Sequence, residues 1–445
     1  MPNYFVAKPK KTNLKEAITF TIDYLDAQGN GVAYWQNKKV FIQGALVQET
    51  VKAKIIEQKS KFIKAKLVEV LTPSADRLPA KCQHYQQCGG CDLQHLTQSK
   101  QLEFKASKLQ ELFNREGITQ ILPWQESLSA KTWHYRRKAR IGVQFTKQGK
   151  AIIGFRRRGS NQLQPIKQCV ILVAPLASIF QPLQNIIDQL TQLKSIGHVE
   201  VIYSEINHEQ QGVTLVIRQL KALNHLDRQH WLNAAKQYNW QIIIDEGKNS
   251  YALTAVNSLS YHLESTLNIT FQFNDFIQVN DQINQQMIKQ ALAWLAPQQK
   301  DVVLDLFCGL GNFSLPIAQY VDQVIGIEGV QDMVKRATIN AKYNNIDNAT
   351  FFQADLNSSW LAQHWAQQCF TKAILDPARA GAYTAVEQLV TLKIATILYI
   401  SCDATTLARD TKLLINAGYK IVKIALMDMF THTKHSETMV LFKLR

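Results

Sequence analysis

The chain has 445 residues, of which 46% are hydrophobic and 19% charged, so its apolar side chains suffice for roughly two to four folded domains. This composition excludes an intrinsically disordered protein, and no apolar run is long enough for a membrane-spanning helix. Residues 1–11 lack the apolar centre of a secretion signal, so we expect a cytoplasmic protein without a membrane partner.

The charge of the chain indicates a polyanionic partner. The formal net charge is +15 and the pI is about 9.3, which favours nucleic acid. The segment 127–187 contains no Asp or Glu, although a solvated surface normally mixes both signs. We expect its basic side chains to form a groove that follows the phosphates of a nucleic acid. These side chains are Lys131, Arg136, Arg137, Lys138, Arg140, Lys147, Lys150, Arg156, Arg157, Arg158 and Lys167.

Residues 12–71 contain short β-type runs that are separated by turn residues such as those of Gln28–Gly31. So many strands in a short segment predict a small closed β-barrel, a fold that often binds single-stranded or looped nucleic acid. The expected strands are Ala17–Tyr24, Gly31–Tyr34, Lys39–Ile42, Thr50–Glu57 and Phe62–Leu71.

Residues 72–265 form the second predicted domain, a mixed α+β domain that carries the basic segment. A helix is predicted over Gln98–Glu116, because leucine and phenylalanine recur there at helical spacing and Gly117 follows. Strand-like and helical runs alternate farther along the domain. The expected strands are Ala139–Phe145, Ala151–Phe155, Val199–Ser204, Gly212–Arg218 and Gln241–Asp245, and the expected helices are Pro175–Leu193 and Leu226–Tyr238.

Three of the seven cysteines, Cys82, Cys88 and Cys91, have a spacing that is typical of metal ligands. Cys169 is the only other cysteine in the first three hundred residues, so we expect it to be the fourth ligand. Four thiolates bind either structural zinc or an iron–sulfur cluster, and the spacing alone does not separate the two. A nearby histidine, His84 or His95, could replace one thiolate, and four buried thiols without a metal are the remaining alternative.

Residues 266–445 form the third predicted domain, in which short apolar strands alternate regularly with helices. This pattern predicts an α/β fold with a doubly wound, mostly parallel sheet. The expected strands are Val302–Leu306, Val324–Ile327, Thr350–Gln353, Ala373–Leu375, Thr396–Ile400 and Met439–Phe442.

Two features of this domain indicate an adenosine-type cofactor. Gly309 and Gly311 make a tight turn directly after the first strand, where backbone N–H groups can approach a ligand. Glu328 ends the second strand, where its carboxylate could accept hydrogen bonds from a ribose diol.

Polar residues also follow the later strands of this predicted sheet. Asp355, Asp376 and Cys402 come after the third, fourth and fifth strands, whose carboxyl ends meet at one edge. An isolated cysteine is most often a small hydrophobic residue. Cys402 shares its edge with Asp376 and with the expected cofactor, so we expect it to be a nucleophile.

These motifs, from Asp301–Phe313 to Ser401–Asp403, resemble those of the RNA uracil-5 methyltransferases, and the resemblance covers essentially the whole chain. It implies a Rossmann-like, S-adenosylmethionine-dependent methyltransferase domain preceded by an OB-like TRAM barrel and an α+β iron–sulfur domain. The four cysteines match the family's cluster ligands, which favours a 4Fe-4S cluster over zinc. The TRAM barrel and cluster together are most similar to the members that methylate uracil 1939 of bacterial 23S ribosomal RNA. We therefore expect this ribosomal RNA as the partner of a monomer that needs no other protein.

The resemblance also implies roles for single residues. Cys402 would be the nucleophile, and Glu437 would be the base that removes the proton from C5 of uracil. The S-adenosylmethionine pocket would be lined by Gln278, Phe307, Asn312, Glu328, Asp355 and Asp376.

The sequence departs from the family pattern at two places. Asp403 and Ala404 stand where Asn-Pro usually follows the nucleophile, and Thr431 stands where proline is frequent. A carboxylate at position 403 opposes formation of a thiolate at position 402 unless it pairs with a cation or points away.

Three alternatives remain at this point. The same chemistry could act on another 23S uridine or on transfer RNA, or the chain could be an RNA-binding protein with an inactive methyltransferase fold. The presence of both Cys402 and Glu437 disfavours the inactive protein. A redox enzyme that uses the cluster is disfavoured because no flavin or nicotinamide motif accompanies the cysteines.

Overall fold

The computed structural model describes residues 16–206, 210–263 and 266–445, which fall into two compact units. The first unit contains the chain up to Tyr85, residues 90–108 and residues 432–434. The second unit contains residues 86–89, 109–431 and 435–445. Residues 1–11 and the first part of the expected barrel, residues 12–15, lie outside the described part of the chain. None of the helices in the described part is both long and apolar enough to cross a membrane.

Residues 18–72 of the first unit form a sheet with the strand order β1-β5-β6-β4-β3-β2. Its strands are β1 (Ile18–Thr21), β2 (Tyr24–Leu25), β3 (Asn30–Trp35), β4 (Lys38–Gln43), β5 (Thr50–Gln58) and β6 (Phe62–Thr72). The expected strand Ala17–Tyr24 is two strands here, β1 and β2, which lie at opposite ends of this order. Alternate side chains such as Val40, Ile42 and Ile63 face inward and form a separate hydrophobic core.

The second unit contains a central sheet, whose main order among the described residues is β13-β12-β11-β10-β7-β8-β9. A hairpin of β14 and β15 joins this sheet, because β14 also pairs with β10. The strands are β7 (Lys138–Phe145), β8 (Ala151–Arg156), β9 (Leu163–Pro165), β10 (Ile196–Ile206), β11 (Gln210–Gln219), β12 (Trp240–Asp245), β13 (Ser250–Ala252), β14 (Leu259–Leu263) and β15 (Leu267–Phe271). The expected domain boundary at residue 266 therefore falls between two strands that pair with each other.

The expected helix Pro175–Leu193 is in fact two helices, α2 (Ala174–Ala177) and α3 (Phe180–Asp188). Pro182 explains the interruption, because a continuous helix would need a hydrogen bond from residue 182 to the carbonyl of Ser178. In α3, Pro182 lies in the first turn, where a missing N–H costs nothing. The prediction of a single helix was therefore wrong.

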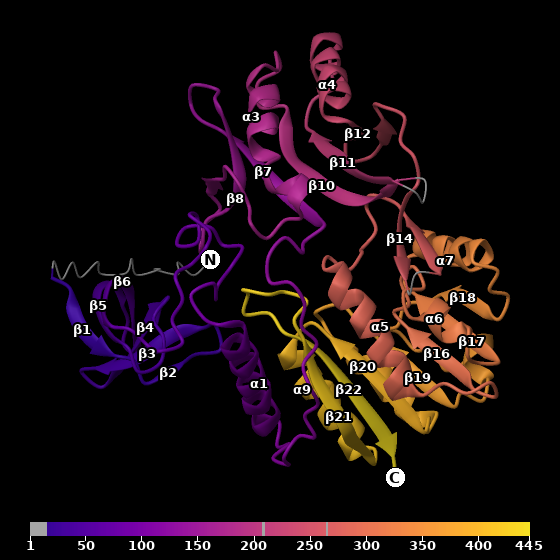
Figure 1. The fold of residues 1–445 in the computed structure, drawn as a ribbon. Helices are drawn as coiled ribbons and strands as arrows, with labels where there is room; N and C mark the ends of the chain where they lie inside the picture. The colour runs from indigo at the N-terminus through magenta and orange to yellow at the C-terminus, as the bar shows by residue number, and fades with distance from the viewer. Residues whose placement is uncertain (1–15, 207–209, 264–265) are drawn as a thin grey trace, which may run out of the picture. The chain divides into compact units, whose positions relative to one another are not determined.

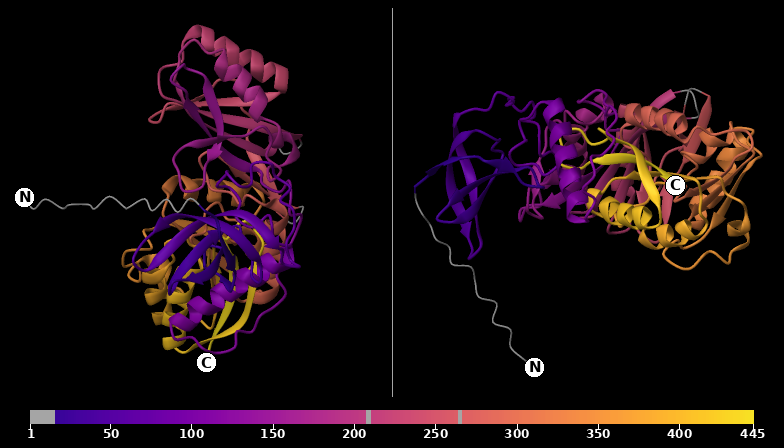
Figure 2. Two further views of the ribbon diagram at one scale, coloured as in Figure 1. Left: turned by 90° about the vertical axis from the view of Figure 1, so that its left-hand side faces the viewer. Right: turned by 90° about the horizontal axis from the view of Figure 1, so that it is seen from below.

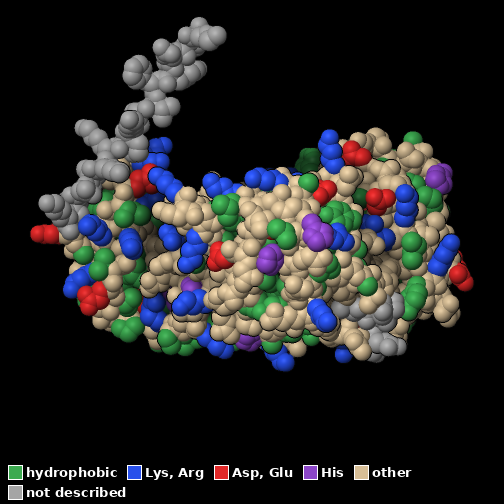
Figure 3. Space-filling view, turned by 90° about the horizontal axis from the view of Figure 1, so that it is seen from above, with side chains coloured by type: hydrophobic (Ala, Val, Ile, Leu, Met, Phe, Trp, Pro, Cys, Tyr) green, Lys and Arg blue, Asp and Glu red, His purple; other side chains and the backbone are tan. Residues whose placement is uncertain are grey.

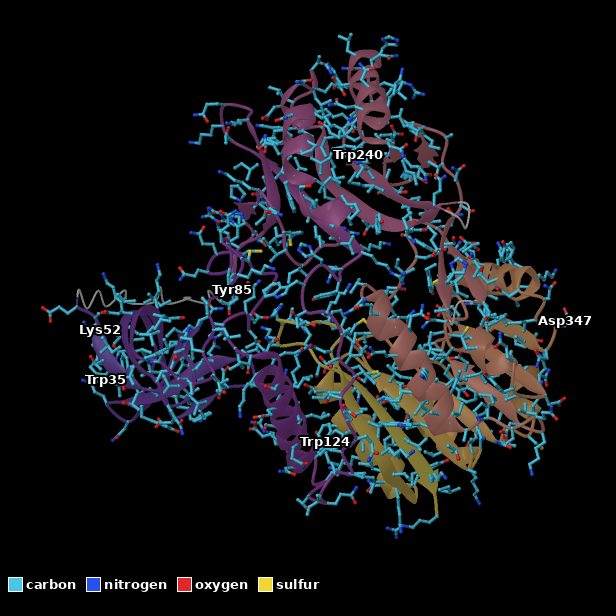
Figure 4. The ribbon with its side chains drawn as sticks, viewed as in Figure 1. Trp35, Lys52, Tyr85, Trp124, Trp240 and Asp347 are labelled. Carbon is cyan, nitrogen blue, oxygen red and sulfur yellow. The ribbon has the colours of Figure 1, made fainter. Side chains whose placement is uncertain are left out.

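Two longer helices agree closely with the sequence. They are α1 (Gln98–Arg115), within which the boundary between the two units falls, and α4 (His225–Tyr238). Trp240, labelled in Figure 4, stacks on Tyr238 where α4 leads into β12, with ring centroids 4.6 Å apart.

The expected doubly wound sheet lies at the C-terminal end of the second unit, with the strand order β18-β17-β16-β19-β20-β22-β21. Neighbouring strands from β18 to β20 are parallel, and β22 runs antiparallel to both of its neighbours. The strands are β16 (Val302–Leu306), β17 (Gln323–Glu328), β18 (Ala349–Gln353), β19 (Lys372–Leu375), β20 (Thr396–Ser401), β21 (Tyr419–Met427) and β22 (Glu437–Leu444).

Helices cover both faces of this sheet, which we call the C-terminal sheet, as Figures 1 and 2 show. One hydrophobic core contains residues of α5 (Asp281–Leu295), α6 (Ser314–Ala318) and α7 (Gln331–Tyr343). The core on the other face contains residues of α8 (Tyr383–Thr391), α9 (Ala404–Asn416), the 3₁₀ helix η1 (His364–Gln367) and the last turns of α1. Successive residues of each strand alternate between the two cores, so the strands are buried on both faces.

The edge strand β21 was not among the predicted strands. A loop runs parallel to it, with bridges from Trp124 to Ile424 and from Leu128 to Met427. Trp124 is labelled in Figure 4 beside the C-terminal sheet. The backbone N–H of Gln125 donates to the carbonyl of Ile424 at 2.7 Å, so this loop covers part of an otherwise open sheet edge.

Candidate active site

The strand order of the C-terminal sheet indicates where a ligand binds. The chain moves outward from β16 through β17 to β18 and then returns to β19 on the other side of β16. Loops on the two sides of such a switch point diverge and leave a crevice at the carboxyl ends of the strands. We call this edge, which carries Gly309, Glu328, Asp376, Cys402 and Glu437, the reactive edge.

The loop after β16 is shaped for close approach of a ligand. Phe307, Gly309 and Gly311 have φ angles of 65°, 56° and 90°, a left-handed conformation that glycine adopts without strain. A Cβ atom at Gly311 would lie 3.0 Å from Leu315, so only glycine fits here without a shift. The N–H of Gly309 donates to Glu328 Oε2 at 3.2 Å, which fixes this carboxylate beside the loop.

Two of the residues expected in the cofactor pocket are anchored within the protein. Asn312 pairs reciprocally with Asn284 of α5, with N···O distances of 3.0 and 3.2 Å between their amides. Gln278 is buried, and its carbonyl accepts a hydrogen bond from Arg137 Nε at 2.9 Å. Gln278 lies in the segment between β15 and α5 that joins the central sheet to the C-terminal sheet, whereas Asn312 lies in the loop after β16.

Asp355 has a different environment, because its side chain binds the loop that it begins. Its carboxylate accepts hydrogen bonds from the N–H of Asn357 at 3.0 Å and from Ser358 Oγ at 2.9 Å. These local hydrogen bonds lower the pKa of Asp355, so it is an anion at neutral pH. An exposed carboxylate held in this way still has lone pairs for a ligand amine.

Cys402 and Glu437 come together through strand register. In the antiparallel pair β20–β22, Ser401 lies opposite Thr438, so Cys402, which directly follows β20, and Glu437, the first residue of β22, adjoin at the reactive edge. Glu437 is only 3% exposed, and the Cys402 thiol is half-buried. The geometry therefore places a thiol and a carboxyl group, 35 positions apart in the sequence, at one point of the sheet edge.

The thiol of Cys402 is held in its neutral form in this structure. Burial raises its pKa to about 12, and the carboxylates of Glu437 and Asp376 add to the shift. Arg379 opposes the shift with its positive charge. The same arginine also opposes the rise in the pKa of Glu437, which burial pushes well above its usual range. Arg379 was not predicted as a site residue, although it lies three positions after Asp376.

A second buried acid lies behind the glycine loop. Asp305 is fully buried, and burial raises its pKa to about 7, with a further contribution from the Asp376 and Glu328 carboxylates. Ser314 donates a hydrogen bond to Asp305 Oδ2, and Asp305 Oδ1 has no partner among the described residues. An unpaired carboxylate oxygen at this position suits a cationic group of a ligand, such as the amino group of an amino acid.

The structure resolves the two departures from the family pattern. Asp403 is the N-cap of α9, and its Oδ1 accepts hydrogen bonds from the N–H groups of Thr405 and Thr406 at 2.9 and 3.2 Å. Its carboxylate is therefore directed to the helix, and it is not among the groups that raise the pKa of Cys402. Thr431 is buried, and its hydroxyl donates to Asp428 Oδ2 at 2.9 Å.

Part of the expected basic groove is not a surface. Arg137 is 6% exposed, and Lys138 Nζ donates to the carbonyls of Phe273 and Asp275 at 2.7 and 2.9 Å, so both side chains bind within the protein. The prediction was wrong for these two residues, because the sequence shows that a side chain is charged but not whether it points to solvent or into the protein. The exposed members are Lys131, Arg140, Lys147, Lys150, Arg156, Arg157 and Lys167. In the face drawn in Figure 3, Lys and Arg side chains are much more frequent than Asp and Glu.

The four candidate metal ligands are divided between the two units. Cys82 and Cys91 belong to the first unit, and Cys88 and Cys169 to the second. All four are half-buried, and Cys88 and Cys169 pack against the core of the central sheet. Within the described part of the chain, no group of three or more His, Cys, Asp or Glu side chains has the arrangement of a metal site.

Comparison with known proteins identifies the family. Residues 97–445 match the profile described as tRNA (Uracil-5-)-methyltransferase, and residues 13–68 match the TRAM domain. The chain belongs to the tRNA (uracil-5-)-methyltransferase family.

Full-length relatives in this family include two bacterial proteins, both named 23S rRNA (uracil(1939)-C(5))-methyltransferase RlmD. The protein of Colwellia psychrerythraea is 49% identical over 99% of both chains. The protein of Psychromonas ingrahamii is 42% identical over 99% of this chain and all of its own. The family resemblance seen in the sequence is thereby confirmed.

A solved structure in the family has the same fold. The Pyrococcus abyssi tRNA (uracil-54, C5)-methyltransferase, determined in complex with S-adenosyl-L-homocysteine, superposes with a TM-score of 0.71. It covers 96% of this chain and is 21% identical in sequence. The expected methyltransferase fold and the TRAM domain are both confirmed.

Proposed function

We propose that this protein transfers the methyl group of S-adenosylmethionine to C5 of a uridine in 23S ribosomal RNA, the uracil 1939 named in its relatives. The observation that carries the proposal is the meeting of Cys402 and Glu437 at the reactive edge, the same edge of the sheet that carries the glycine loop after β16. A monomer in the cytoplasm, where this RNA would be available, is part of the same proposal.

The residues at the reactive edge fit S-adenosylmethionine. The glycine loop turns tightly at the carboxyl end of β16, Glu328 presents a carboxylate beside it, and Asp305 has a buried oxygen without a partner among the described residues. We propose that Gln278, Phe307, Asn312, Glu328, Asp355 and Asp376 line this pocket. When bound, the cofactor supplies an electrophilic methyl group.

C5 of uracil is too weakly nucleophilic to accept a methyl group directly. Cys402 makes C5 more nucleophilic by adding to the ring. The Cys402 thiolate forms a bond to C6, and the electrons of the C5–C6 double bond move into an enolate. C5 of the enolate would then form its bond to the methyl carbon as the bond between that carbon and the cofactor's sulfur breaks, and S-adenosylhomocysteine would leave. Glu437 removes the C5 proton, the double bond re-forms, and the S–C6 bond breaks to return the thiolate. The target base must leave its stack to reach this edge.

The first unit offers a surface for the RNA strand that carries this base. We define the outer face as Tyr34, Lys39, Phe41, Phe62 and Lys64 of β3, β4 and β6. Register places Tyr34 beside Lys39 and Lys39 beside Phe62, so aromatic and basic side chains alternate across neighbouring strands. Phe41 and Phe62 are in edge contact, with ring centroids 6.0 Å apart. Alternating rings and cations suit the bases and phosphates of a single strand.

The charges of this outer face are not all available to RNA at once. Lys59 and Lys64 lie 5.3 and 5.6 Å from the ring centroid of Phe62, and both form ion pairs with Glu57, at 3.2 and 2.9 Å. A phosphate would compete with this single carboxylate for two ammonium groups. Because exposed ion pairs are weak, replacing the Glu57 carboxylate by a phosphate costs little free energy.

Methylation of defined RNA fragments tests the proposed substrate. Purified protein and labelled S-adenosylmethionine are incubated with a fragment of 23S ribosomal RNA around uracil 1939, with the same fragment carrying cytosine at that position, and with transfer RNA. We expect label only in the first. Label in transfer RNA, or equal label in the cytosine fragment, would replace the proposed substrate by one of the alternatives.

The covalent step has its own test. A fragment with 5-fluorouridine at the target position has no C5 proton to lose, so the adduct with Cys402 cannot resolve. We expect a protein–RNA species that survives denaturing electrophoresis and appears only with S-adenosylmethionine present. RNA binding without such a species, and without methylation of the normal fragment, would favour an inactive RNA-binding protein.

We propose in addition that Cys82, Cys88, Cys91 and Cys169 bind a 4Fe-4S cluster that has a structural role. The support is the donor set, since four half-buried thiols can supply all the ligands of such a cluster or of zinc. Anaerobic purification followed by iron, zinc and sulfide analysis separates the two. Iron and sulfide in equal amounts are expected, whereas zinc without sulfide would establish a zinc site instead.

A further inference from the structure

A buried tyrosine of the central sheet reaches the expected cofactor pocket. Tyr261 lies in β14 and is only 4% exposed. Its hydroxyl donates a hydrogen bond to Asn312 Oδ1 at 3.1 Å, although Asn312 belongs to the loop after β16, 51 positions later in the sequence. No property of the proposed reaction requires a tyrosine here, so its contact needs a separate explanation.

The amide of Asn312 has two possible orientations, and one neighbour alone cannot choose between them. Asn312 and Asn284 exchange two hydrogen bonds, from Nδ2 of each residue to Oδ1 of the other. If both amides turned over together, the same two bonds would form again with the atoms exchanged. The pair by itself is therefore degenerate.

Tyr261 removes this degeneracy. Its hydrogen needs an acceptor, and in the observed orientation Asn312 Oδ1 provides it. In the reversed orientation an amide N–H group would face the hydroxyl, and the buried hydroxyl hydrogen would lose its partner. Burial also raises the pKa of Tyr261 above its usual range, so the hydroxyl remains a donor at every working pH.

Arg137 holds the tyrosine ring in place. Its guanidinium carbon lies 4.6 Å from the centroid of the Tyr261 ring, and Nη1 forms an ion pair with Asp281 Oδ1 at 2.9 Å. Asp281 begins α5, the helix that carries Asn284. Arg137, which directly precedes β7 of the central sheet, is therefore linked to the Asn312 amide in two ways. It packs on Tyr261, which bonds the amide, and it pairs with Asp281 of the helix that carries Asn284.

From these contacts we infer that Tyr261 is a positioning residue for cofactor binding: with Asn284, it fixes the Asn312 amide so that one N–H of Nδ2 faces the pocket. The second hydrogen of Nδ2 has no partner among the described residues and is available to an acceptor on the cofactor. The inference rests on the proposed role of Asn312 in the cofactor pocket. It makes the affinity for the cofactor depend on a strand of the central sheet that pairs with β10.

The test is a double-mutant cycle on the full-length protein, with S-adenosylhomocysteine as the probe in a calorimetric titration. We expect Tyr261→Phe to weaken binding about twofold, because the two orientations of the amide pair then become about equally populated and only one of them presents N–H to the cofactor. The affinity for the ribosomal RNA fragment and the melting temperature should stay near their wild-type values. In an Asn312→Ala background, Tyr261→Phe should cause no further loss, because the amide that it orients is absent.

Tyr419→Phe is the matched control. Tyr419 is also buried, and its hydroxyl donates to the carbonyl of Ile394 at 2.8 Å, in the core on the other face of the sheet. We expect it to leave the affinity for S-adenosylhomocysteine unchanged. If Tyr261→Phe does not fold, Asn284→Ala enters the same cycle in its place, with the same expected dependence on Asn312.

Each outcome separates the inference from the function on which it rests. Wild-type affinity in Tyr261→Phe, or the same loss in both backgrounds, overturns the positioning role and leaves the proposed methyltransferase intact. Failure of the wild-type protein itself to bind S-adenosylhomocysteine overturns the proposed function and this inference with it.

Discussion

The reactive edge and the outer face of the first unit use charge in opposite ways. At the reactive edge, buried acids such as Asp305 and Glu437 have raised pKa values, and the Cys402 thiol is neutral because of its surroundings. On the outer face, lysines such as Lys39 are exposed and lie among aromatic rings. The expected chemistry at the reactive edge therefore depends on single atoms and protons. The expected affinity of the outer face for RNA is instead the sum of many similar contacts. Mutations should have large, specific effects on the first and small, additive effects on the second.

The largest effect is expected from Cys402→Ala. Removal of the thiol removes the only step that activates C5, so methyl transfer should fall by at least about a thousandfold. Binding of S-adenosylhomocysteine should survive, since Cys402 lies beside the pocket and is not among its expected lining. Filter-based methyl transfer and calorimetry measure the two quantities. Cys369→Ala, at an exposed cysteine, is the control, and normal turnover in Cys402→Ala would remove the nucleophile assignment.

Glu437→Gln should block the reaction at a later point. Cys402 and the methyl group can still add to the ring, but no base remains to remove the C5 proton, so turnover should fall about 10²- to 10⁴-fold. An RNA–protein adduct should accumulate on ordinary uridine RNA and be visible by denaturing electrophoresis. The control is Glu387→Gln, which changes an exposed glutamate of α8. Slow turnover without an adduct would assign Glu437 to an earlier step.

The pH dependence of Cys402 alkylation tests the electrostatics of the reactive edge. Burial is the main cause of its pKa of about 12, and Glu437 and Asp376 contribute. Only about one thiol in ten thousand would then be ionised at pH 8, and the alkylation rate should rise about tenfold per pH unit up to that pKa. In Glu437→Gln one of the opposing carboxylates is gone, so the pKa should fall and alkylation at pH 8 should be faster.

Peptide mass spectrometry with iodoacetamide measures this rate for each cysteine separately, and the exposed Cys369 serves as an internal reference. A Cys402 that reacts at pH 8 as fast as Cys369, with no change in Glu437→Gln, would contradict the description of a neutral, desolvated thiol.

A moderate effect is expected on the outer face. Phe62→Ala removes one ring of the alternating rows, and a stacked base contributes about 1–3 kcal/mol, so affinity for the RNA fragment should fall about tenfold. Turnover at saturating RNA should be unchanged, because the reactive edge is intact. The control is Ile56→Ala, which removes an exposed apolar side chain of β5 outside these rows. Fluorescence anisotropy measures the affinity, and equal losses in both variants would argue against a stacking surface.

The smallest effect is expected at the position that departs from the family pattern. Asp403→Asn should change turnover less than about twofold, because Asn caps a helix about as well as Asp. Asp403→Ala should lower the free energy of unfolding by about 1 kcal/mol through loss of the cap, again with little change in turnover. Denaturant unfolding and methyl transfer measure the pair. A large gain in turnover in either variant would show that the carboxylate opposes the thiolate after all.

The elements that position the reactive edge were largely predictable, because their signals are local. Buried parallel strands are short apolar runs, and the two glycines after β16 mark a tight turn with positive φ angles. The break between α2 and α3 also has a local cause in Pro182, and a stricter reading of the sequence could have found it.

Contacts between distant segments were not predictable in this way. The hydrogen bond from Tyr261 to Asn312 joins residues that no periodicity connects, and the inward direction of Arg137 and Lys138 depends on the backbone after β15. The strand β21 was missed because its lysines, Lys420 and Lys423, interrupt the apolar pattern on which the other strands were recognised. The sequence alone does not show where a side chain points or which distant residue it contacts, because the packing of the sheets determines both.

The reversed direction of β22 has a practical consequence for work with this enzyme. Because the strand starts at Glu437 and runs away from the reactive edge, its last residue, Leu444, lies about 24 Å from the proposed base. A purification tag or fluorophore attached beside Leu444 would begin at the opposite edge of the sheet. Labels for single-molecule or pull-down experiments should therefore be placed there, away from the residues proposed to act on the RNA.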